Sequence, residues 1–370
     1  MHYMENNGYG TIWLDEQDNT VVHVIDQRRL PFFMETIALR SSGDVCDAIT
    51  CMTLRGAPLI GVAGAFGMYL ATLEPLTGTS IKDHLIRTAG NLISCRPTAV
   101  NLPWAVNRVL EKLLKAPGGV SLSGLALEEA LGIREEEIER CRLIGTNGVG
   151  LIEELSRSKN GAPVNILTHC NAGWLACVRY GTATAPVYLA HERGIPVHVW
   201  VDETRPLNQG ARLTAWELGR SGIPYTLITD NAGGHLLQKG MVDIVITGGD
   251  RVTPSGDVAN KIGTYLKALA ASDNNIPFYV AVPSSSIDLS IRDPFSEIII
   301  EERDREEVTT VAGFAEGSLI KVRICPEDSS ASNPGFDITP ARLITGLITE
   351  KSMCRADEND IKRLFSDKTD

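Results

Sequence analysis

The sequence lacks the residue patterns that hold metal ions or build disulfide frameworks. Its eight cysteines include no Cys-x-x-Cys pair, and its seven histidines form neither His-Glu-x-x-His nor His-x-His. Zinc sites and small disulfide-stapled folds depend on such spacings. We therefore expect no bound metal, and we expect cysteines that stay reduced.

Long hydrophobic runs and an excess of basic residues are also missing. Nowhere are 18 consecutive residues apolar, and residues 1–10 contain no basic stretch leading into an apolar one, so we expect no membrane span and no secretion signal. The net charge of −11 argues against a nucleic-acid partner bound through its phosphates. A small anion can still bind at a local basic patch. These absences predict a soluble, cytoplasmic protein.

Nucleotide-binding loops are absent as well. The sequence has no Gly-x-x-x-x-Gly-Lys-Ser/Thr motif and no Gly-x-Gly-x-x-Gly after a strand-like segment, which argues against an ATPase and a dinucleotide enzyme. What is present is a chain of 370 residues, 43% of them hydrophobic, which is enough for two cores. We expect two domains, residues 1–140 and 141–370.

The smaller amino-terminal domain is predicted to combine a short antiparallel sheet with helices. Two alternating runs within residues 9–24, separated by a polar tripeptide, are typical of a hairpin. Helical spacing of apolar residues follows in five segments. These are residues 42–54, 59–73, 81–92, 104–114 and 125–155.

Beyond residue 162, strand-like and helical segments alternate. The expected strands are residues 164–169, 196–203, 224–230, 243–249, 277–283 and 297–301, and the expected helices are residues 174–192, 213–221, 232–239 and 260–271. Such alternation is typical of an α/β fold with a Rossmann-like, doubly wound, mostly parallel sheet covered by helices on both faces. Ligands of these sheets bind at the carboxyl ends of the strands.

Cys170 follows the first strand of this sheet, in the segment VNILTHCNAG. A thiol between a strand and a helix that starts near Trp174 would sit beside unpaired backbone N–H groups, which favour the thiolate. The alternative is a buried structural thiol, the usual state of an unpaired cysteine. Local features favour neither interpretation over the other.

Asp250 follows the apolar strand DIVITGG. The two glycines allow a backbone or ligand to approach closely, and the apolar strand predicts a partly desolvated carboxyl with a raised pKa. A carboxyl protonated in this way can act as a general acid. The alternative, a cap for the following helix, is the commoner role of an aspartate at a strand end.

Several basic residues stand where an anion could bind. Arg55 and Arg96 each lie at a helix boundary beside Gly or Pro, where backbone N–H groups can be unpaired. Lys261, after Asn260, is expected at a helix start, where a cation is unfavourable unless an anion such as a phosphate lies there.

Seven segments together resemble the methylthioribose-1-phosphate isomerase family, which is related to the alpha, beta and delta regulatory subunits of the eukaryotic translation-initiation exchange factor. They read RGAP, RPTAVNL, THCNAG, DETRPLNQGARLTAWEL, TGGDRV, GDVANKIGTY and NPGFDITP. The resemblance, over residues 54–350, implies a Rossmann-like domain with a small amino-terminal domain, a homodimer, and isomerisation of an aldose 1-phosphate to a ketose 1-phosphate without a cofactor.

By the same resemblance, Asp250 is the proton donor and Cys170 is the second catalytic residue. The implied substrate-binding residues are Arg55, Gly56, Ala57, Arg96, Gln209, Asn260 and Lys261. Because these residues come from both halves of the chain, the sugar phosphate is expected in the cleft between the two domains.

The resemblance favours 5-methylthioribose 1-phosphate, a compound of methionine salvage, as the substrate. 5-Deoxyribose 1-phosphate and ribose 1,5-bisphosphate are alternatives, which differ in the C5 substituent. Trp174 is expected to contribute to an apolar C5 pocket. A regulatory, nucleotide-sensing subunit without turnover is the alternative from another class, and it is disfavoured because such subunits generally lack the pair formed here by Cys170 and Asp250.

Overall fold

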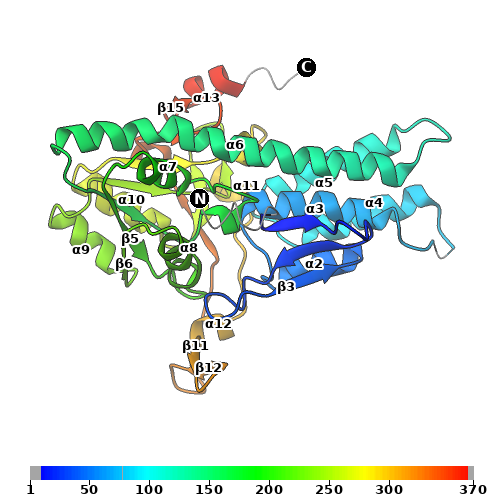
Figure 1. The fold of residues 1–370 in the computed structure, drawn as a ribbon, viewed down its shortest axis with the longest axis horizontal. Coiled ribbons are helices and arrows are strands. Elements are labelled where there is room, and N and C mark those ends of the chain that lie inside the picture. The colour runs from blue at the N-terminus through cyan, green and yellow to red at the C-terminus, as the bar shows by residue number, and fades with distance from the viewer. Residues whose placement is uncertain (1–9, 77, 366–370) are drawn as a thin grey trace.

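The computed structural model describes residues 10–76 and 78–365, in which a helical unit and a unit built on a parallel sheet lie side by side (Figure 1). The helical unit begins with an antiparallel sheet of strands β1 (Ile12–Leu14), β2 (Val22–Ile25) and β3 (Thr36–Leu39). The predicted amino-terminal hairpin is therefore present. Tyr9, where the prediction began, lies outside the described residues.

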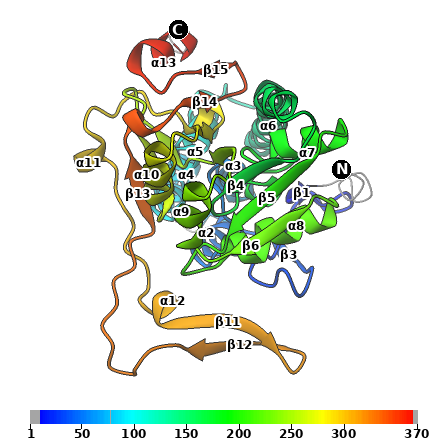
Figure 2. The same cartoon turned by 90° about the vertical axis from the view of Figure 1, so that its left-hand side faces the viewer.

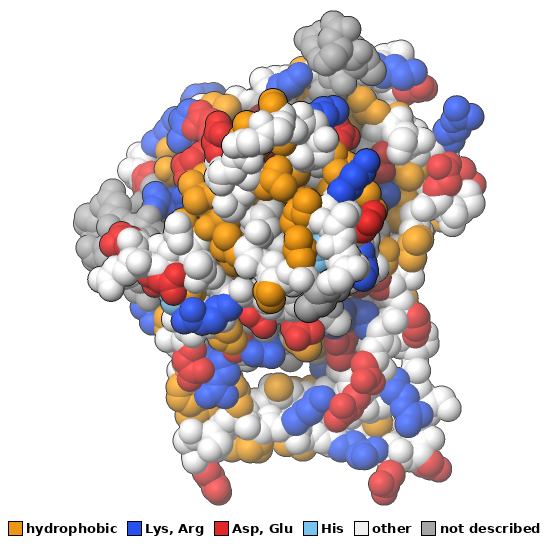
Figure 3. Space-filling view, turned by 90° about the vertical axis from the view of Figure 1, so that its right-hand side faces the viewer, with side chains coloured by type: hydrophobic (Ala, Val, Ile, Leu, Met, Phe, Trp, Pro, Cys, Tyr) orange, Lys and Arg blue, Asp and Glu red, His pale blue; other side chains and the backbone are white. Residues whose placement is uncertain are grey.

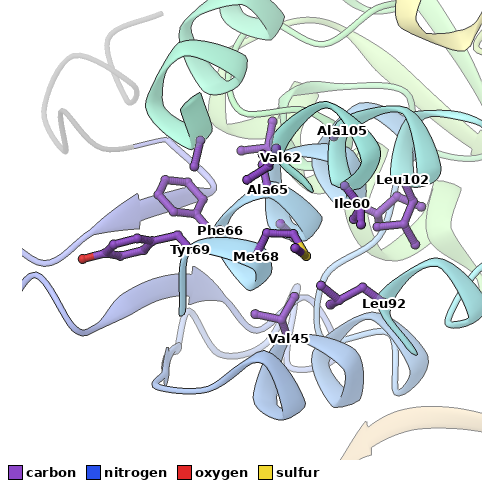
Figure 4. Packing of buried hydrophobic residues seen from close by; sticks show 14 of the residues in the cluster. Val45, Ile60, Val62, Ala65, Phe66, Met68, Tyr69, Leu92, Leu102 and Ala105 are labelled. Atoms are coloured by element: carbon purple, nitrogen blue, oxygen red, sulfur yellow. The ribbon is translucent and has the colours of Figure 1, made fainter. Parts of the chain in front are cut away.

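Helix α3 (Ala57–Ala71) forms the centre of the helical unit. All of its residues are buried, because its sequence is apolar on every side. Figure 4 shows Phe66 and Met68 within the hydrophobic cluster around this helix. A side chain at Gly64 would lie only 2.6 Å from a methyl group of Leu102, so this glycine permits close helix packing. The surrounding helices are α2 (Ser42–Thr50), α4 (Ile81–Ser94) and α5 (Asn101–Leu114).

Helix α6 (Leu122–Ser158) runs along both units (Figure 1). Ala126 and Ile133 belong to the core of the helical unit, whereas Ile144 and Ile152 belong to the core beside the parallel sheet. The predicted boundary after residue 140 thus falls inside this continuous helix. Within the described ranges, no helix combines the length and the apolar character needed to cross a membrane.

A seven-stranded sheet organises the second unit, with strand order β15-β14-β10-β7-β4-β5-β6. All neighbouring pairs are parallel except β14 with β15, which confirms the predicted mostly parallel sheet. The chain builds the sheet outward in opposite directions from β4 and β7, so the topological switch lies between these two strands. The strands are β4 (Val164–Thr168), β5 (Val197–Asp202), β6 (Tyr225–Ile228), β7 (Ile244–Thr247), β10 (Phe278–Ala281), β14 (Gly346–Ile348) and β15 (Met353–Cys354).

Helices cover both faces of this sheet, as predicted for a doubly wound fold (Figure 2). One hydrophobic cluster joins the sheet to α6, α7 (Ala185–Glu192) and α8 (Ala215–Arg220). The other cluster joins it to the helices of the opposite face. These are α9 (Ala232–Gln238), α10 (Thr264–Asp273) and α13 (Glu358–Phe365).

A separate three-stranded antiparallel sheet, in the order β13-β9-β8, lies beside the carboxyl ends of the parallel strands. It consists of β8 (Arg251–Val252), β9 (Val258–Lys261) and β13 (Phe336–Thr339). Between β9 and β13 the chain forms the short helices α11 (Pro294–Glu297) and α12 (Glu306–Thr309). It then forms a hairpin of β11 (Thr310–Ala315) and β12 (Ser318–Arg323), which projects from the body (Figures 1 and 2).

Three predicted elements are wrong. The expected helix over residues 174–192 is a single 3-10 turn, a bent segment and the short α7, because residues with positive φ, including Tyr180 at +65° and Gly181 at +80°, turn the chain back. The expected helix over residues 260–271 begins only at Thr264, since Asn260 and Lys261 pair with β13. The expected strand at residues 297–301 is the end of α11 and irregular chain.

Candidate active site

One cavity lies at the topological switch of the sheet and between the two units. Cys170, beyond the end of β4, and Asp250, beyond the end of β7, line it together. The other seven residues predicted to bind substrate line it as well: Arg55, Gly56, Ala57, Arg96, Gln209, Asn260 and Lys261. The structure therefore brings together every predicted site residue, from both halves of the chain.

Cys170 occupies a constrained backbone position, with φ of +63°. Its N–H donates to the hydroxyl of Thr204 at 2.8 Å, and its carbonyl oxygen accepts from the hydroxyl of Thr214 at 2.7 Å. These bonds fix the thiol at the cavity wall, where Cys170 is 9% exposed. The predicted helix start behind it is absent. The positive neighbour of the thiol is instead the side chain of Lys261, with which Cys170 interacts electrostatically.

Asp250 is held by the small sheet. Its backbone N–H donates to the carbonyl oxygen of Ala259 in β9 at 2.9 Å. Because strand β8 and not a helix follows it directly, Asp250 does not have the predicted alternative role of a helix cap. Burial raises the pKa of the Asp250 carboxyl, and the neighbouring cations, Lys261 first, lower it in part. Desolvation is also the cause that the sequence predicts for a raised pKa of Asp250. Asp250 is half-buried and lines the cavity, so its carboxyl can meet a ligand, and the raised pKa favours its protonated form.

Lys261 is the cation with the largest electrostatic effect on the pKa of Asp250. It is 6% exposed, and its ammonium donates to the carbonyl oxygen of Gly335 at 3.0 Å. It also lies 4.3 Å from the ring centre of Phe336, which lines the same cavity. Burial lowers the pKa of Lys261, whereas Cys170 and Asp250 raise it. A buried ammonium for which the described residues provide one hydrogen-bond acceptor, the carbonyl oxygen of Gly335, suits an anionic ligand.

Arg55 and the amino end of α3 form the opposite wall. Gly56 has φ of +105°, and a side chain there would lie 2.4 Å from the carbonyl oxygen of Ala176, so the chain enters the helix where only glycine fits. No side chain caps α3. The backbone N–H of Ala57 therefore lies at the cavity with a guanidinium beside it, an arrangement that favours a phosphate.

Arg96 and Gln209 complete the polar lining. The Arg96 side chain is 3.3 Å from the Glu301 carboxylate, which balances its charge. The side-chain amide oxygen of Gln209 is buried and has no hydrogen-bond partner among the described residues. A buried acceptor without a donor is costly, and a hydroxyl group of a ligand would satisfy it. The lining thus offers cations for an anion and an acceptor for a hydroxyl.

His169, Asp202 and Asp230 bring a ring nitrogen and two carboxylates together behind Cys170. The Lys267 ammonium lies 3.1 Å from Asp202, and the Asp230 carboxylate accepts the backbone N–H groups of Thr204 and Arg205 at 2.7 Å each. Protein cations and donors occupy this cluster. It does not fit a metal ion and supports the loop that carries Cys170.

Sequence reasoning missed several residues of the lining and misplaced one. Met52, Asn171 and Phe336 line the cavity, although the motifs CNAG and NPGF contain two of them. Trp174 does not line it. Its ring packs 5.9 Å from that of Trp216 within the core beside the sheet, so the predicted role of Trp174 in a C5 pocket is wrong.

A second cavity, of about 500 Å³, adjoins the first and shares Met52, Arg55 and Gln209 with it. The segment from α12 to the hairpin forms its far side. In space-filling view an opening separates this projecting hairpin from the body (Figure 3). More basic than acidic side chains line this second cavity. The cations are Arg28, Arg55, Arg212, Arg303 and Lys321, and the acids are Asp304, Glu306 and Glu307.

Comparison with known proteins agrees with this geometry. The model of the "Initiation factor 2 subunit family" matches residues 53–355. This chain belongs to the initiation factor 2 subunit family. A family member from Desulfatibacillum aliphaticivorans, named methylthioribose-1-phosphate isomerase, is 54% identical over 367 residues, which cover 99% of this chain and 100% of that protein. The resemblance found in the motifs is confirmed.

Two solved structures of the initiation factor 2 subunit family share the fold. The crystal structure of 5-methylthioribose 1-phosphate isomerase from Pyrococcus horikoshii OT3 has a TM-score of 0.80 and 37% identity, over 96% of each chain. That of translation initiation factor eIF-2B, subunit delta, from A. fulgidus has a TM-score of 0.75 and 40% identity, over 96% of this chain and 99% of the other.

Proposed function

We propose that this chain is an aldose–ketose isomerase that converts 5-methylthioribose 1-phosphate to 5-methylthioribulose 1-phosphate. One observation carries the proposal: a carboxyl with a raised pKa and a thiol line one cavity together with three cations, Arg55, Arg96 and Lys261. The name of the 54% identical relative supports the same substrate. A bound metal or cofactor is not needed for this chemistry.

The phosphate is assigned to the cationic wall. Arg55, with the amino end of α3, and Lys261, on the other side of the cavity, supply positive charge for its oxygens. Arg96 adds a third cation. An anchored phosphate holds C1 and C2 of the sugar between Asp250 and Cys170. The reacting groups are then already oriented, which lowers the entropic part of the activation barrier.

Asp250 is assigned the first proton transfer. In an aldose 1-phosphate the anomeric oxygen is esterified, so the ring cannot open through a free hemiacetal hydroxyl. Protonation of the ring oxygen by Asp250 lets the bond between C1 and that oxygen break, which leaves C1 electron-poor and the carboxylate negative. Lys261 and Arg96, the two cations that act most strongly on Asp250, stabilise that charge.

Cys170 is assigned the removal of the hydrogen on C2. As thiolate it takes this hydrogen as a proton and leaves an enol phosphate, and proton return to C1 with loss of the O2 proton gives the ketone. In the alternative route, the hydrogen moves from C2 to C1 as a hydride. Cys170 then stabilises the charge without acting as a base. Both routes need the acid.

The second cavity is assigned to substrate entry. It joins the first at Arg55 and Gln209, and its excess of cations contrasts with the chain's net charge of −11. A local positive potential of this kind concentrates a sugar phosphate at the mouth of the site. The homodimer, the cytoplasmic location and the place in methionine salvage are carried from the family as predictions.

The 40% identity with the initiation-factor subunit supports a second candidate, a regulatory subunit without turnover. Incubation of the purified chain with 5-methylthioribose 1-phosphate, followed by NMR detection of the C2 ketone, separates the two. Parallel reactions with 5-deoxyribose 1-phosphate and ribose 1,5-bisphosphate rank the C5 substituents by kcat/KM. We expect the methylthio compound to rank first. No ketone from any of the three contradicts the proposed isomerase.

A further inference from the structure

Glu217, on α8, is a fully buried carboxylate that the proposed chemistry leaves without a role. One of its oxygens accepts the backbone N–H of Leu175 at 2.8 Å, and the other accepts the hydroxyl of Tyr188 at 2.9 Å. The first oxygen also accepts the side-chain amide of Asn171 at 3.2 Å. Two segments that lie apart in the sequence, the loop at residues 171–175 and α7, therefore converge on one carboxylate.

The loop after Cys170 is shaped around this carboxylate. A side chain at Gly173 would lie 1.6 Å from Oε2 of Glu217, so the loop passes where any residue other than glycine would displace the carboxylate. Such close contact, with Leu175 donating from the same loop, fixes the carboxylate relative to residues 170–175.

Asn171 connects Glu217 to the cationic wall of the active site. Its side-chain oxygen and its backbone carbonyl oxygen both accept hydrogen bonds from the Arg55 guanidinium; the backbone bonds measure 2.8 and 2.9 Å. The NH₂ group of the same amide donates hydrogen bonds to the hydroxyl of Thr214 and to the carboxyl of Glu217. A reversed amide would turn its NH₂ toward the Arg55 guanidinium, which has no acceptor, so the network favours the orientation in which the oxygen faces Arg55 and the NH₂ faces Glu217.

The geometry assigns Glu217 as a positioning residue: we infer that it fixes the amide of Asn171 so that Asn171 holds the Arg55 guanidinium ready for the substrate phosphate. The inference rests on the proposed function, because it deepens the phosphate-binding role of Arg55. Glu217 itself lies behind the cavity wall and touches no substrate. Its contribution is the preorganisation of a cation that otherwise has many rotamers.

Two substitutions separate this role from general stabilisation. Glu217→Met keeps the length of the side chain but removes every acceptor, so the Asn171 amide is no longer held. We expect KM for the sugar phosphate to rise about tenfold or more, with a smaller change in kcat, because a displaced binding group weakens anchoring before it affects the chemistry. Glu217→Gln keeps an acceptor for Leu175 and Asn171 and should restore KM to near the wild-type value.

Tyr188→Phe is the matched control. It removes the third hydrogen bond to the same carboxylate but leaves the Asn171 link intact, so it should lower Tm without raising KM. Inhibition by inorganic phosphate provides a second readout, and its Ki should rise in Glu217→Met in parallel with KM. Asn171→Ala breaks the link from the other end. The double variant with Glu217→Met should raise KM no further than the larger single effect.

The outcomes distinguish the inference from the proposed function. Wild-type protein that does not isomerise any sugar phosphate contradicts the function. Active wild-type protein, together with a Glu217→Met variant whose KM and phosphate Ki are unchanged, overturns the inference. If Glu217→Met does not fold, Asn171→Ala decides: unchanged Ki for phosphate in that variant overturns the inference, and a Ki raised about tenfold supports it.

Discussion

The backbone N–H of Asp250 and the carbonyl oxygen of Ala259 form a 2.9 Å hydrogen bond that joins the end of β7 to β9. Because Asn260 and Lys261 follow Ala259 directly, this bond sets the Asp250 carboxyl beside Lys261, one of the buried cations of the cavity. The small sheet thus positions both Asp250 and Lys261, so the proposed proton donation and the proposed phosphate binding share one support.

The lysine of this pair gives a prediction about binding. Lys261→Met removes the point charge assigned to the phosphate but keeps most of the side-chain volume. A lost charge-assisted hydrogen bond is worth about 1.5–3 kcal/mol, so KM should rise about 10–100-fold while kcat changes less. Steady-state kinetics measure both. Lys159→Met, which breaks the ion pair with Asp243 far from the cavity, serves as the control and should leave KM unchanged. Equal KM values in both variants would remove Lys261 from the phosphate site.

Cys170 gives a prediction about the fate of the C2 hydrogen. If its thiolate is the base, reaction in heavy water places deuterium at C1 of the ketose, and NMR or mass spectrometry detects it. Cys170→Ser should lose about 10²–10⁴-fold in kcat, because the hydroxyl is a far weaker base at neutral pH. A product without deuterium, formed under conditions that exclude internal return of the proton, contradicts the base role and supports a hydride shift.

Glu217 gives a prediction about the pH dependence of stability. Burial raises the pKa of this carboxyl from 4.5 to about 7, although Leu175, Tyr188 and Asn171 donate to it and Arg55 lies near. Between these values the folded chain holds a proton that the unfolded chain releases, so the free energy of unfolding falls as pH rises from 4.5 through 7. The contribution is on the order of 3 kcal/mol.

Urea unfolding at pH 5 and pH 8 tests this dependence. The loss of stability between the two pH values should be smaller in Glu217→Gln, which cannot titrate, than in the wild-type protein. An identical loss in both proteins means that Glu217 titrates in the folded chain as it does in the unfolded one.

The second cavity gives a prediction about substrate capture. Lys321 on β12 lies 3.1 Å from Glu306 and is about half exposed. Lys321→Glu should lower kcat/KM about threefold at low salt, and added salt should shrink the difference, because screening weakens long-range attraction. The control is Lys362→Glu on α13, whose lysine also pairs with a glutamate. A similar loss in both variants points to net charge and not to this cavity.

The sequence predicted the sheet and the strand ends well, because buried strands and amphipathic helices leave clear periodicities. Cys170 and Asp250 were found in this way. The sequence predicts Lys261 at a helix start, because nothing in VANK distinguishes a short strand from a helix start. The segment forms a strand because it pairs with β13, which lies more than 70 residues away in the sequence. The turn at Tyr180 and Gly181 was also hidden, since a positive φ at a tyrosine leaves no signal in the sequence.

The position of Glu217 could not be predicted from the sequence either. Its motif, LTAWEL, reads as an ordinary amphipathic helix, and the charged residue in it predicts a solvent-exposed position. Only the folded loop after Cys170, with Gly173 against the carboxylate, places it at the back of the active site. Residues that act through a second residue depend on contacts distant in sequence, so no local pattern identifies them.

The most direct test of the account is a comparison of wild-type protein with Asp250→Asn, with 5-methylthioribose 1-phosphate as substrate. Asparagine keeps the shape of the side chain and cannot donate the proton that opens the ring. The account predicts that the wild-type protein forms the ketose, and that Asp250→Asn still binds the sugar phosphate while its kcat falls about 10²–10⁴-fold. Wild-type kcat in Asp250→Asn would contradict the assignment of Asp250 as the acid.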